Sequence, residues 1–250
     1  MKFTYSAYAE LVDKLKKNGY SFADYQDCDN YEKCVIIRHD IDTDCQKALK
    51  LARLEKDLGI KSTYFALLTS EMYNLAAKVN LDAIEEICNL GHNVGLHFDE
   101  VRYIGESEDE KQKMGGSFSV EQWILNEVEI MERILNREVN CVSMHRPSKT
   151  TLEADYDLGR VVNSYGMKFF KGYKYVSDSR RRWREDVLGI IDSGEYDKLH
   201  ILTHAFWYND EEESIEETVG KYVKSGNADR WDSLEKNITD LSTIIGRNEI

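Results

Sequence analysis

The sequence predicts a parallel α/β fold in a single domain, because short apolar runs typical of strands alternate about six times with amphipathic helical segments. The chain has 250 residues, enough for one sizeable core. Hydrophobic residues make up 42% and charged residues 32%, the balance of a soluble globular protein. A single proline leaves no proline-rich linker that would divide the chain.

Helices are predicted where apolar residues recur three and four positions apart, and strands where apolar runs are shorter. Three helices end at Gly19, Gly59 and Gly91, and two begin with capping boxes at Thr43 and Ser119. The predicted helices span residues 6–18, 43–58, 81–90, 119–135, 152–164 and, as acidic helix and loop, 211–246. The predicted strands span residues 34–39, 62–68, 93–98, 139–144, 168–172 and 200–203.

We expect one domain over residues 1–250, with an N-terminal helical extension over about residues 1–30. An acidic C-terminal helical tail is expected over about residues 211–250. The long connection over residues 99–118 is rich in Glu, Asp, Lys and Gly, and its length is typical of an active-site loop.

The net charge of −13, from 46 acidic and 33 basic residues, argues against nucleic acid as a partner, because phosphate repulsion would oppose binding. One basic cluster, Arg180, Arg181, Arg182 and Arg184, is either a solvated loop or a site for an anionic group such as a phosphate. No apolar run approaches the roughly 20 residues of a membrane span. Five scattered cysteines without a C-x-x-C pair, and a first segment without a secretory signal pattern, predict reduced thiols and a cytoplasmic location.

The apolar run over residues 35–42 ends in two carboxylates, Asp40 and Asp42. Residues i and i+2 of a strand share a face, so both side chains are expected to point the same way. Two like charges side by side are unfavourable unless a cation lies between them or one is protonated. A solvated turn is the alternative, but the helix predicted from Thr43 places the pair where parallel α/β folds build active sites.

Polar residues that a core strand does not need follow four of the predicted strands. Five of the six histidines lie in these segments, and four of them, His39, His97, His145 and His204, lie at strand termini. Several histidines at successive strand ends, together with two aspartates, are difficult to explain by stability alone. The segments are Arg38-His39-Asp40-Ile41-Asp42, Gly91-His92-Asn93-Val94-Gly95-Leu96-His97, His145-Arg146-Pro147-Ser148 and Leu202-Thr203-His204.

In their order and spacing these segments resemble the motifs of the NodB-type polysaccharide deacetylases, a carbohydrate esterase superfamily, in its Asp-x-Asp branch. The resemblance runs from about residue 34 to residue 208. It implies a distorted (β/α) barrel and a hydrolase that depends on a divalent metal ion, with zinc expected.

The resemblance also implies the roles of the site residues. Asp40 would be the general base, and Asp42 and His97 would be metal ligands. Arg146 would hold the base, and His204 would be the general acid. An amide hydrolase needs this set, because it must activate a water, stabilise a tetrahedral intermediate and protonate the leaving amine.

The chain departs from the family pattern at one metal ligand, since Val101 stands where the family has a second histidine. The candidates for the third ligand are His145, Asp99, Glu100 and Asp178. We place His145 first, because imidazole suits zinc and because Pro147 favours an end of the strand before it. Asp178 and His39 are otherwise expected to contact the substrate or to support the site residues.

The expected activity is removal of an acyl group, acetyl above all, from an N-acylated sugar or glycan precursor, as in the synthesis of surface polysaccharides. Two alternatives remain open from the sequence. One is a metal-poor relative that binds a sugar without turning it over, which Val101 favours. The other is a hydrolase of cyclic amides on the same fold.

Overall fold

The computed structural model describes residues 1–104 and 119–247, so most of the predicted loop over residues 99–118 lies outside the described residues. The chain divides into two compact units, Met1–Asp210 and Glu211–Ile250. The second unit coincides with the predicted acidic tail. The single-domain organisation of the whole chain stays a prediction.

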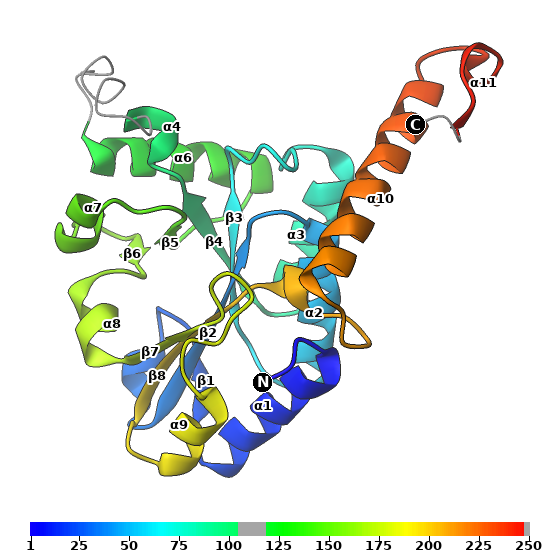
Figure 1. Cartoon of the computed structure of the whole chain (residues 1–250). Coiled ribbons are helices and arrows are strands. Elements are labelled where there is room, and N and C mark those ends of the chain that lie inside the picture. The colour runs from blue at the N-terminus through cyan, green and yellow to red at the C-terminus, as the bar shows by residue number, and fades with distance from the viewer. Residues whose placement is uncertain (105–118, 248–250) are drawn as a thin grey trace. The chain divides into compact units, whose positions relative to one another are not determined.

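One parallel sheet of eight strands organises the first unit (Figure 1). Its order is β6-β5-β4-β3-β2-β8-β7, and β1 pairs with the first half of β2. Every pairing is parallel, so the carboxyl ends of all the strands lie at the same edge. The strands are β1 (Ser21–Ala23), β2 (Cys34–Ile41), β3 (Thr63–Leu67), β4 (Asn93–Phe98), β5 (Cys141–Met144), β6 (Val162–Asn163), β7 (Lys174–Ser177) and β8 (Lys198–Thr203).

The sheet is curled into a half-barrel, which confirms the predicted distorted (β/α) barrel. Arg38 lies in β2 and Ser164 directly follows β6, four places away in the strand order. In a flat sheet that separation would be about 19 Å, given about 4.8 Å between strands. Yet Arg38 Nη1 donates a hydrogen bond of 3.0 Å to Ser164 Oγ, which requires the sheet to fold round toward itself.

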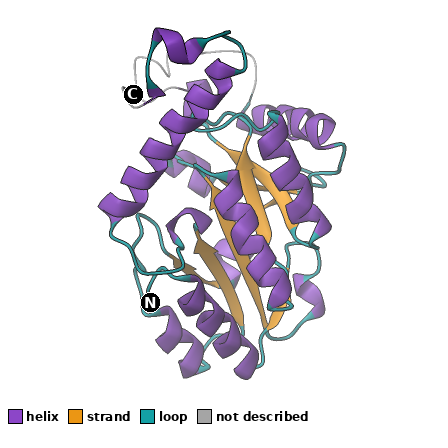
Figure 2. Cartoon of the chain, turned by 90° about the vertical axis from the view of Figure 1, so that its right-hand side faces the viewer, coloured by secondary structure: helices purple, strands orange, loops and turns teal. Residues whose placement is uncertain are grey.

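Helices cover the convex face of this sheet, and in Figure 2 several of them lie in front of the strands. The main core lies between sheet and helices and is built from apolar side chains at helical spacing, such as Tyr8, Leu11 and Leu15 of α1. The helices of the first unit are α1 (Tyr5–Lys17), α2 (Cys45–Asp57), α3 (Lys78–Asn89), α4 (Val101–Ile104), α6 (Val120–Leu135), α7 (Lys149–Glu153), α8 (Met167–Gly172) and α9 (Val187–Ser193), with 3₁₀ turns η1 (Cys28–Asn30) and η2 (Ala205–Trp207).

A second, smaller core fills the inside of the half-barrel. It includes Tyr25, Phe65, Cys141 and Phe169. Gly95 of β4 is required here, because a Cβ at this position would lie 2.5 Å from the Phe65 ring and 2.7 Å from both the backbone oxygen and the sulfur of Cys141. The glycine of the Gly-x-His motif therefore serves packing.

A buried carboxylate stabilises the contact between α1, α2 and the sheet. Glu55 of α2 accepts hydrogen bonds from Tyr8, from Ser62 Oγ at 2.6 Å and from Tyr64 at 2.6 Å, and its Oε1 lies 2.9 Å from His39 Nε2. Burial alone would raise its pKa, but the imidazole of His39 and the hydroxyl donors lower the pKa of Glu55 to about 2. The carboxylate thus stays ionised in the core because its partners compensate its lost hydration.

Most predicted elements are present, but several predictions are wrong. The predicted helix over residues 152–164 is mostly loop, because the chain turns through positive φ at Asp155 and Gly159 (45° and 61°). The predicted strand over residues 168–172 is part of α8, and the strand follows it as β7. Helix α2 is capped by the Asp44 carboxylate, which accepts hydrogen bonds from the backbone N–H groups of Gln46 and Lys47. The predicted capping box at Thr43 is therefore absent.

The first thirty residues pack into the first unit. Helix α1 contributes to the main core, and β1 extends the sheet. An isolated parallel bridge joins Thr4 to Asn209, where Tyr5 N donates to the Asn209 carbonyl at 3.0 Å and Asn209 N donates to the Phe3 carbonyl at 3.2 Å. The two ends of the first unit are therefore hydrogen-bonded to each other.

The second unit is mainly helix α10 (Ile215–Glu235), followed by the short helix α11 (Leu241–Ile244). Ser214 and Glu217 form a complete capping box at the start of α10, as the sequence pattern of helix starts favours. Across residues 1–104 and 119–247, no helix has the length and apolar character needed to cross a membrane.

Candidate functional site

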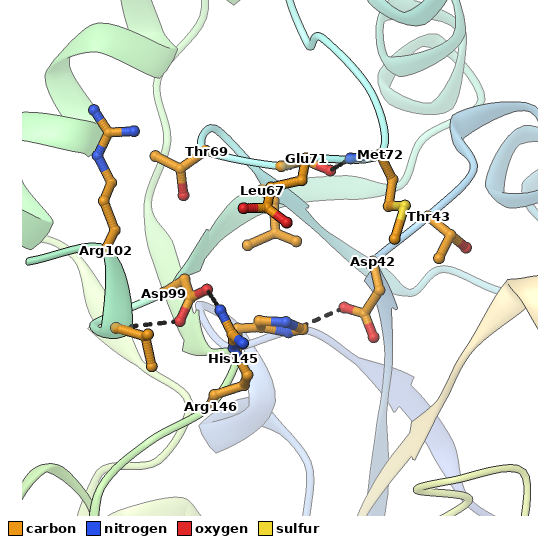
Figure 3. A pocket seen from close by; sticks show the side chains of 12 residues that line it. Asp42, Thr43, Leu67, Thr69, Glu71, Met72, Asp99, Arg102, His145 and Arg146 are labelled. Atoms are coloured by element: carbon orange, nitrogen blue, oxygen red, sulfur yellow. Dashed lines mark hydrogen bonds and ion pairs between the residues drawn. The ribbon is translucent and has the colours of Figure 1, made fainter. Parts of the chain in front are cut away.

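Three predicted metal ligands meet at the carboxyl edge of the sheet, and they come from three different strand ends. Asp42 follows β2, His97 lies near the end of β4, and His145 follows β5. Asp42 Oδ1 lies 3.3 Å from His97 Nε2 and 3.3 Å from His145 Nδ1, and the two imidazole nitrogens are 3.2 Å apart. Figure 3 shows Asp42 and His145 facing each other at the base of a pocket.

This triangle has the dimensions of a metal site. Bonds of about 2.0–2.1 Å and tetrahedral angles place two ligands of a zinc-like ion about 3.3 Å apart. The three measured separations agree with that value. In addition, Asp42 Oδ1 is buried and accepts no well-formed hydrogen bond from a described residue, as expected for an atom reserved for a cation. The donor set of one carboxylate and two imidazoles therefore fits a divalent ion.

His145 can face the site because β5 has already ended. The strand stops at Met144, and His145 N makes one last ladder bond to the Phe98 carbonyl at 2.8 Å. Strict alternation of side chains no longer applies to the next residues, which precede Pro147. His145 turns toward Asp42, and Arg146 turns to Asp99, where Nη2 and Oδ2 are 2.5 Å apart.

The other candidates for the third ligand have different partners. Val101 begins α4 and lines the same pocket without offering a ligand atom. Asp99 pairs with Arg146, and Glu100 is buried, where it accepts from Ser148 N at 2.6 Å and from Thr151 Oγ1. Both carboxylates thus hold the backbone around the site, and His145 occupies the corner of the triangle.

The charges in the triangle support one another. Burial would raise the pKa of Asp42, but the imidazoles of His145 and His97 hold it well below its usual range. Burial would lower the pKa of His145, but the Asp42 carboxylate raises it above its ordinary value. The site therefore favours an ionised Asp42, which is the form that binds a cation.

Asp40 lies beside the triangle and is held by an arginine, but that arginine is Arg38. Arg38 Nη2 is 2.6 Å from Asp40 Oδ2, and both side chains are almost completely buried. Burial would raise the pKa of Asp40, and the Arg38 guanidinium lowers it below its ordinary value. The prediction that Arg146 holds the base is wrong, because Arg146 has left the strand and contacts Asp99 beside the pocket.

Sequence reasoning missed Arg38, although a signal was present. Arg38 precedes Asp40 by two residues in the same strand, so alternation places both on the inner face. The other oxygen of Asp40, Oδ1, is buried and has no hydrogen-bond partner among the described residues. Asp40 Oδ2 also lies 3.6 Å from His97 Nε2, so the ionised carboxylate borders the triangle of Asp42, His97 and His145.

His204 approaches the triangle from the opposite side, at the end of β8, with its Nε2 3.7 Å from Asp42 Oδ2. Asp178, which follows β7, holds the other ring nitrogen, with Oδ1 2.6 Å from His204 Nδ1. Asp178 Oδ2 accepts from His204 N at 2.9 Å and from Thr203 Oγ1 at 2.5 Å. Asp178 thus supports a site residue, one of the two roles expected for it.

The Asp178 contact sets the protonation state of His204. Burial would lower the pKa of His204, but the Asp178 carboxylate outweighs it and raises the pKa to about 9. The imidazole is therefore protonated at neutral pH, with Nε2–H directed at the site and Nδ1–H at Asp178. Thr203 fixes Asp178 in turn and was not predicted.

His39 does not lie at the site. It alternates with Arg38 and Asp40, so its ring points to the outer face of the sheet and pairs with Glu55 at 2.9 Å. The expectation that His39 contacts substrate is wrong. Its ring supports the packing of α2 on the sheet.

The pocket above the triangle has a volume of about 680 Å³, within the range of small-molecule sites. Figure 3 shows Thr69, Glu71 and Met72, from the segment after β3, across the pocket from His145 and Arg146. Polar and charged groups thus surround an opening that leads to the metal triangle and is large enough for a sugar.

The triangle predicts a specific response of metal binding to substitution. Asp42→Asn and His145→Ala each remove one of the three ligands. Substitution of a residue that only hydrogen-bonds to a metal ligand lowers metal affinity by up to roughly 100-fold, so loss of a ligand itself should lower the affinity for a divalent ion by more than that. Asp40→Asn should retain the ion, because Asp40 lies beside the triangle. Elemental analysis after dialysis against zinc or cobalt measures this. Equal occupancy in Asp42→Asn and wild type would refute the ligand assignment.

The free energy of unfolding distinguishes the role of Arg38 from that of Arg146. Arg38→Met leaves the buried Asp40 charge without its partner and should lower the free energy of unfolding by about 3–5 kcal/mol. Arg146→Met removes an ion pair whose arginine is half exposed and should cost about 1 kcal/mol or less. Urea denaturation of both variants provides the comparison, and equal losses would contradict the assignment of Arg38 to Asp40.

No protein-family profile matches the sequence, and no curated protein matches it. Solved structures with a similar fold include a family 4 carbohydrate esterase from Bacillus anthracis, with TM-score 0.44 and 16% identity over 86% of this chain and 85% of that chain. Another is the Streptococcus pyogenes deacetylase PplD in complex with acetate, with TM-score 0.43 and 17% identity over 60% of this chain and 66% of that chain.

A third is BA3943 of Bacillus anthracis, described as a family 4 pseudoenzyme, with TM-score 0.44 and 16% identity over 78% of this chain and 62% of that chain. The matches span less than two thirds of the PplD and BA3943 chains.

Proposed function

We propose that the protein is a metal-dependent hydrolase that removes an acetyl group from an N-acylated sugar or glycan precursor. The observation that carries this proposal is the metal-sized triangle of Asp42, His97 and His145, flanked by an ionised Asp40 and a protonated His204. Hydrolysis of an amide needs a base and an acid on either side of the reacting carbon, and these two residues supply them.

Asp42, His97 and His145 would hold the ion, and two imidazoles with one carboxylate favour zinc. When bound, a divalent ion lowers the pKa of a bound water and polarises the acyl oxygen. Three protein ligands leave a coordination position open for these groups, as in catalytic zinc sites.

The remaining steps belong to the chain. Asp40 takes the proton of the attacking water as general base, and Arg38 keeps it ionised and oriented. His204 donates a proton from Nε2 to the leaving amine nitrogen. Asp178 holds the Nδ1–H and stabilises the imidazolium before that transfer. Arg146 and Glu71 line the pocket, where they would lie beside sugar hydroxyls.

The five cysteines are free thiols, four of them buried, which supports the proposal of a reducing compartment such as the cytoplasm. A soluble sugar precursor is the substrate expected in that location. The third ligand from His145 favours an active enzyme over a metal-poor sugar-binding relative.

Acetate release tests the activity. Zinc-loaded wild-type protein should release acetate from a panel of N-acetylated sugars, and Asp40→Asn should lose about 100- to 10,000-fold in turnover while keeping its metal. Glu86→Gln, at an exposed ion pair with Arg53 on the outer helices, is the matched control and should retain full activity. Equal turnover in Asp40→Asn and wild type would reject the proposed base.

The pH dependence tests the acid. His204 must be protonated to act, so activity should fall as pH rises through its pKa of about 9. Asp178→Asn removes the carboxylate charge that raises the pKa of His204, while burial of the ring still lowers that pKa. The pH at which activity falls on the alkaline side should therefore be lower in Asp178→Asn than in wild type. Profiles of kcat from pH 5 to 10 measure the shift. An unchanged alkaline limb in Asp178→Asn would contradict the assignment of this limb to His204.

A further inference from the structure

The loop between β7 and α9, drawn in yellow-green in Figure 1, carries an unusual concentration of positive charge. Arg180, Arg182 and Arg184 are exposed, and none of them forms an ion pair with a described residue. The whole chain has 46 acidic and 33 basic residues, so acidic partners are abundant. Three neighbouring arginines without a carboxylate form a local cationic patch, which we call the arginine loop (Arg180, Arg182 and Arg184).

The backbone of this loop is held in a strained conformation. Arg180 and Arg181 have φ angles of 61° and 55°, a left-handed region that costs non-glycine residues energy. Arg182 N donates to the Asp178 carbonyl at 3.0 Å, and the Arg181 guanidinium lies 5.6 Å from the Phe3 ring and 6.0 Å from the Trp207 ring. Packing of Arg181 thus fixes the loop in place and leaves the arginines on either side exposed.

The arginine loop follows closely after Asp178, a residue of the proposed site. Asp178 contacts His204 at 2.6 Å, and Arg180 follows it by two residues. Two residues of extended chain span at most about 7 Å, so the Cα of Arg180 lies within that distance of the Asp178 Cα. A substrate whose amide nitrogen meets His204 would therefore have its next substituents within reach of the arginine side chains.

We propose that the arginine loop binds a phosphoryl group of the substrate, so that the preferred substrates are N-acylated sugars that carry a phosphate or diphosphate. This inference rests on the proposed deacetylase function. Guanidinium groups bind phosphate through paired N–H donors, and a cationic patch on an acidic protein attracts an anionic ligand to that place. A nucleotide-linked sugar and a lipid-linked sugar diphosphate both present this group.

The test compares wild type with the double variant Arg180→Gln/Arg182→Gln. The substrates are N-acetylglucosamine, N-acetylglucosamine 1-phosphate, uridine diphosphate N-acetylglucosamine and a short polyprenyl diphosphate N-acetylglucosamine. In wild type, kcat/KM should be at least tenfold higher for the phosphorylated sugars than for the free sugar. The double variant should lose at least tenfold of that ratio. Arg133→Gln, at an exposed arginine of α6, is the control and should keep the wild-type ratio.

Calorimetric titration with inorganic pyrophosphate provides a measurement that does not need turnover. Wild type should bind this probe at least tenfold more tightly than the double variant, with affinity that falls as salt increases. The two diphosphate substrates distinguish a nucleotide-linked from a lipid-linked source. Thermal midpoints verify that the double variant is folded.

Failure of the inference and failure of the function have different results. If acetate is released equally well from free and phosphorylated sugars, and pyrophosphate binds both proteins equally, the function stands and the phosphoryl site is overturned. If no sugar releases acetate but pyrophosphate binding still depends on Arg180 and Arg182, the phosphoryl site stands and the deacetylase function falls.

Discussion

The buried ion pair of Arg38 and Asp40 is the interaction on which the rest of the site depends. A guanidinium inside a half-barrel is costly unless its donors are used. Arg38 Nη2 donates to Asp40 and Nη1 donates to Ser164, and its Cζ lies 5.4 Å from the centre of the Phe65 ring and 5.0 Å from the centre of the Tyr165 ring. Its Nε has no hydrogen-bond partner among the described residues. The same side chain therefore neutralises the proposed base and joins the central strand to the end of the sheet at β6.

The Arg38–Asp40 ion pair gives the two aspartates of the Asp-x-Asp motif different environments. Asp40 and Asp42 are two residues apart and share a face, yet they have different partners. One oxygen of Asp40 pairs with Arg38 inside the half-barrel, whereas Asp42 lies at the open end between two imidazoles. A cation at the triangle would be held by Asp42, and Asp40 would stay available to accept a proton.

The sequence was sufficient for the residues whose positions follow from strand ends. Asp40, Asp42, His97 and His204 end apolar runs, and parallel strands bring such ends to the same edge. His39 belongs to the same motif as Arg38 and Asp40, but alternation along β2 turns its side chain to the outer face of the sheet. The resemblance places Arg146 at the base, but the chain after β5 leaves the strand, and Arg146 pairs with Asp99.

The short strands at the two ends of the sheet are the least predictable elements. Strand β6 has two residues, and β7 has four, so neither gives a readable alternation. The apolar pair Phe169 and Phe170 resembled a strand, but one ring is buried and the other is half exposed on α8. The role of Asp178 depends on β7, and therefore its contact with His204 became visible only in the structure.

The bridge between Thr4 and Asn209 has a consequence for the order of folding. It closes a loop of roughly two hundred residues, and closing such a loop in a disordered chain costs about 5 kcal/mol of entropy by a (3/2)RT ln n estimate. Two backbone hydrogen bonds cannot compensate that cost by themselves. The bridge itself can therefore form only after the sheet has brought β8 and η2 beside the first residues, which during synthesis means after nearly the whole first unit has left the ribosome.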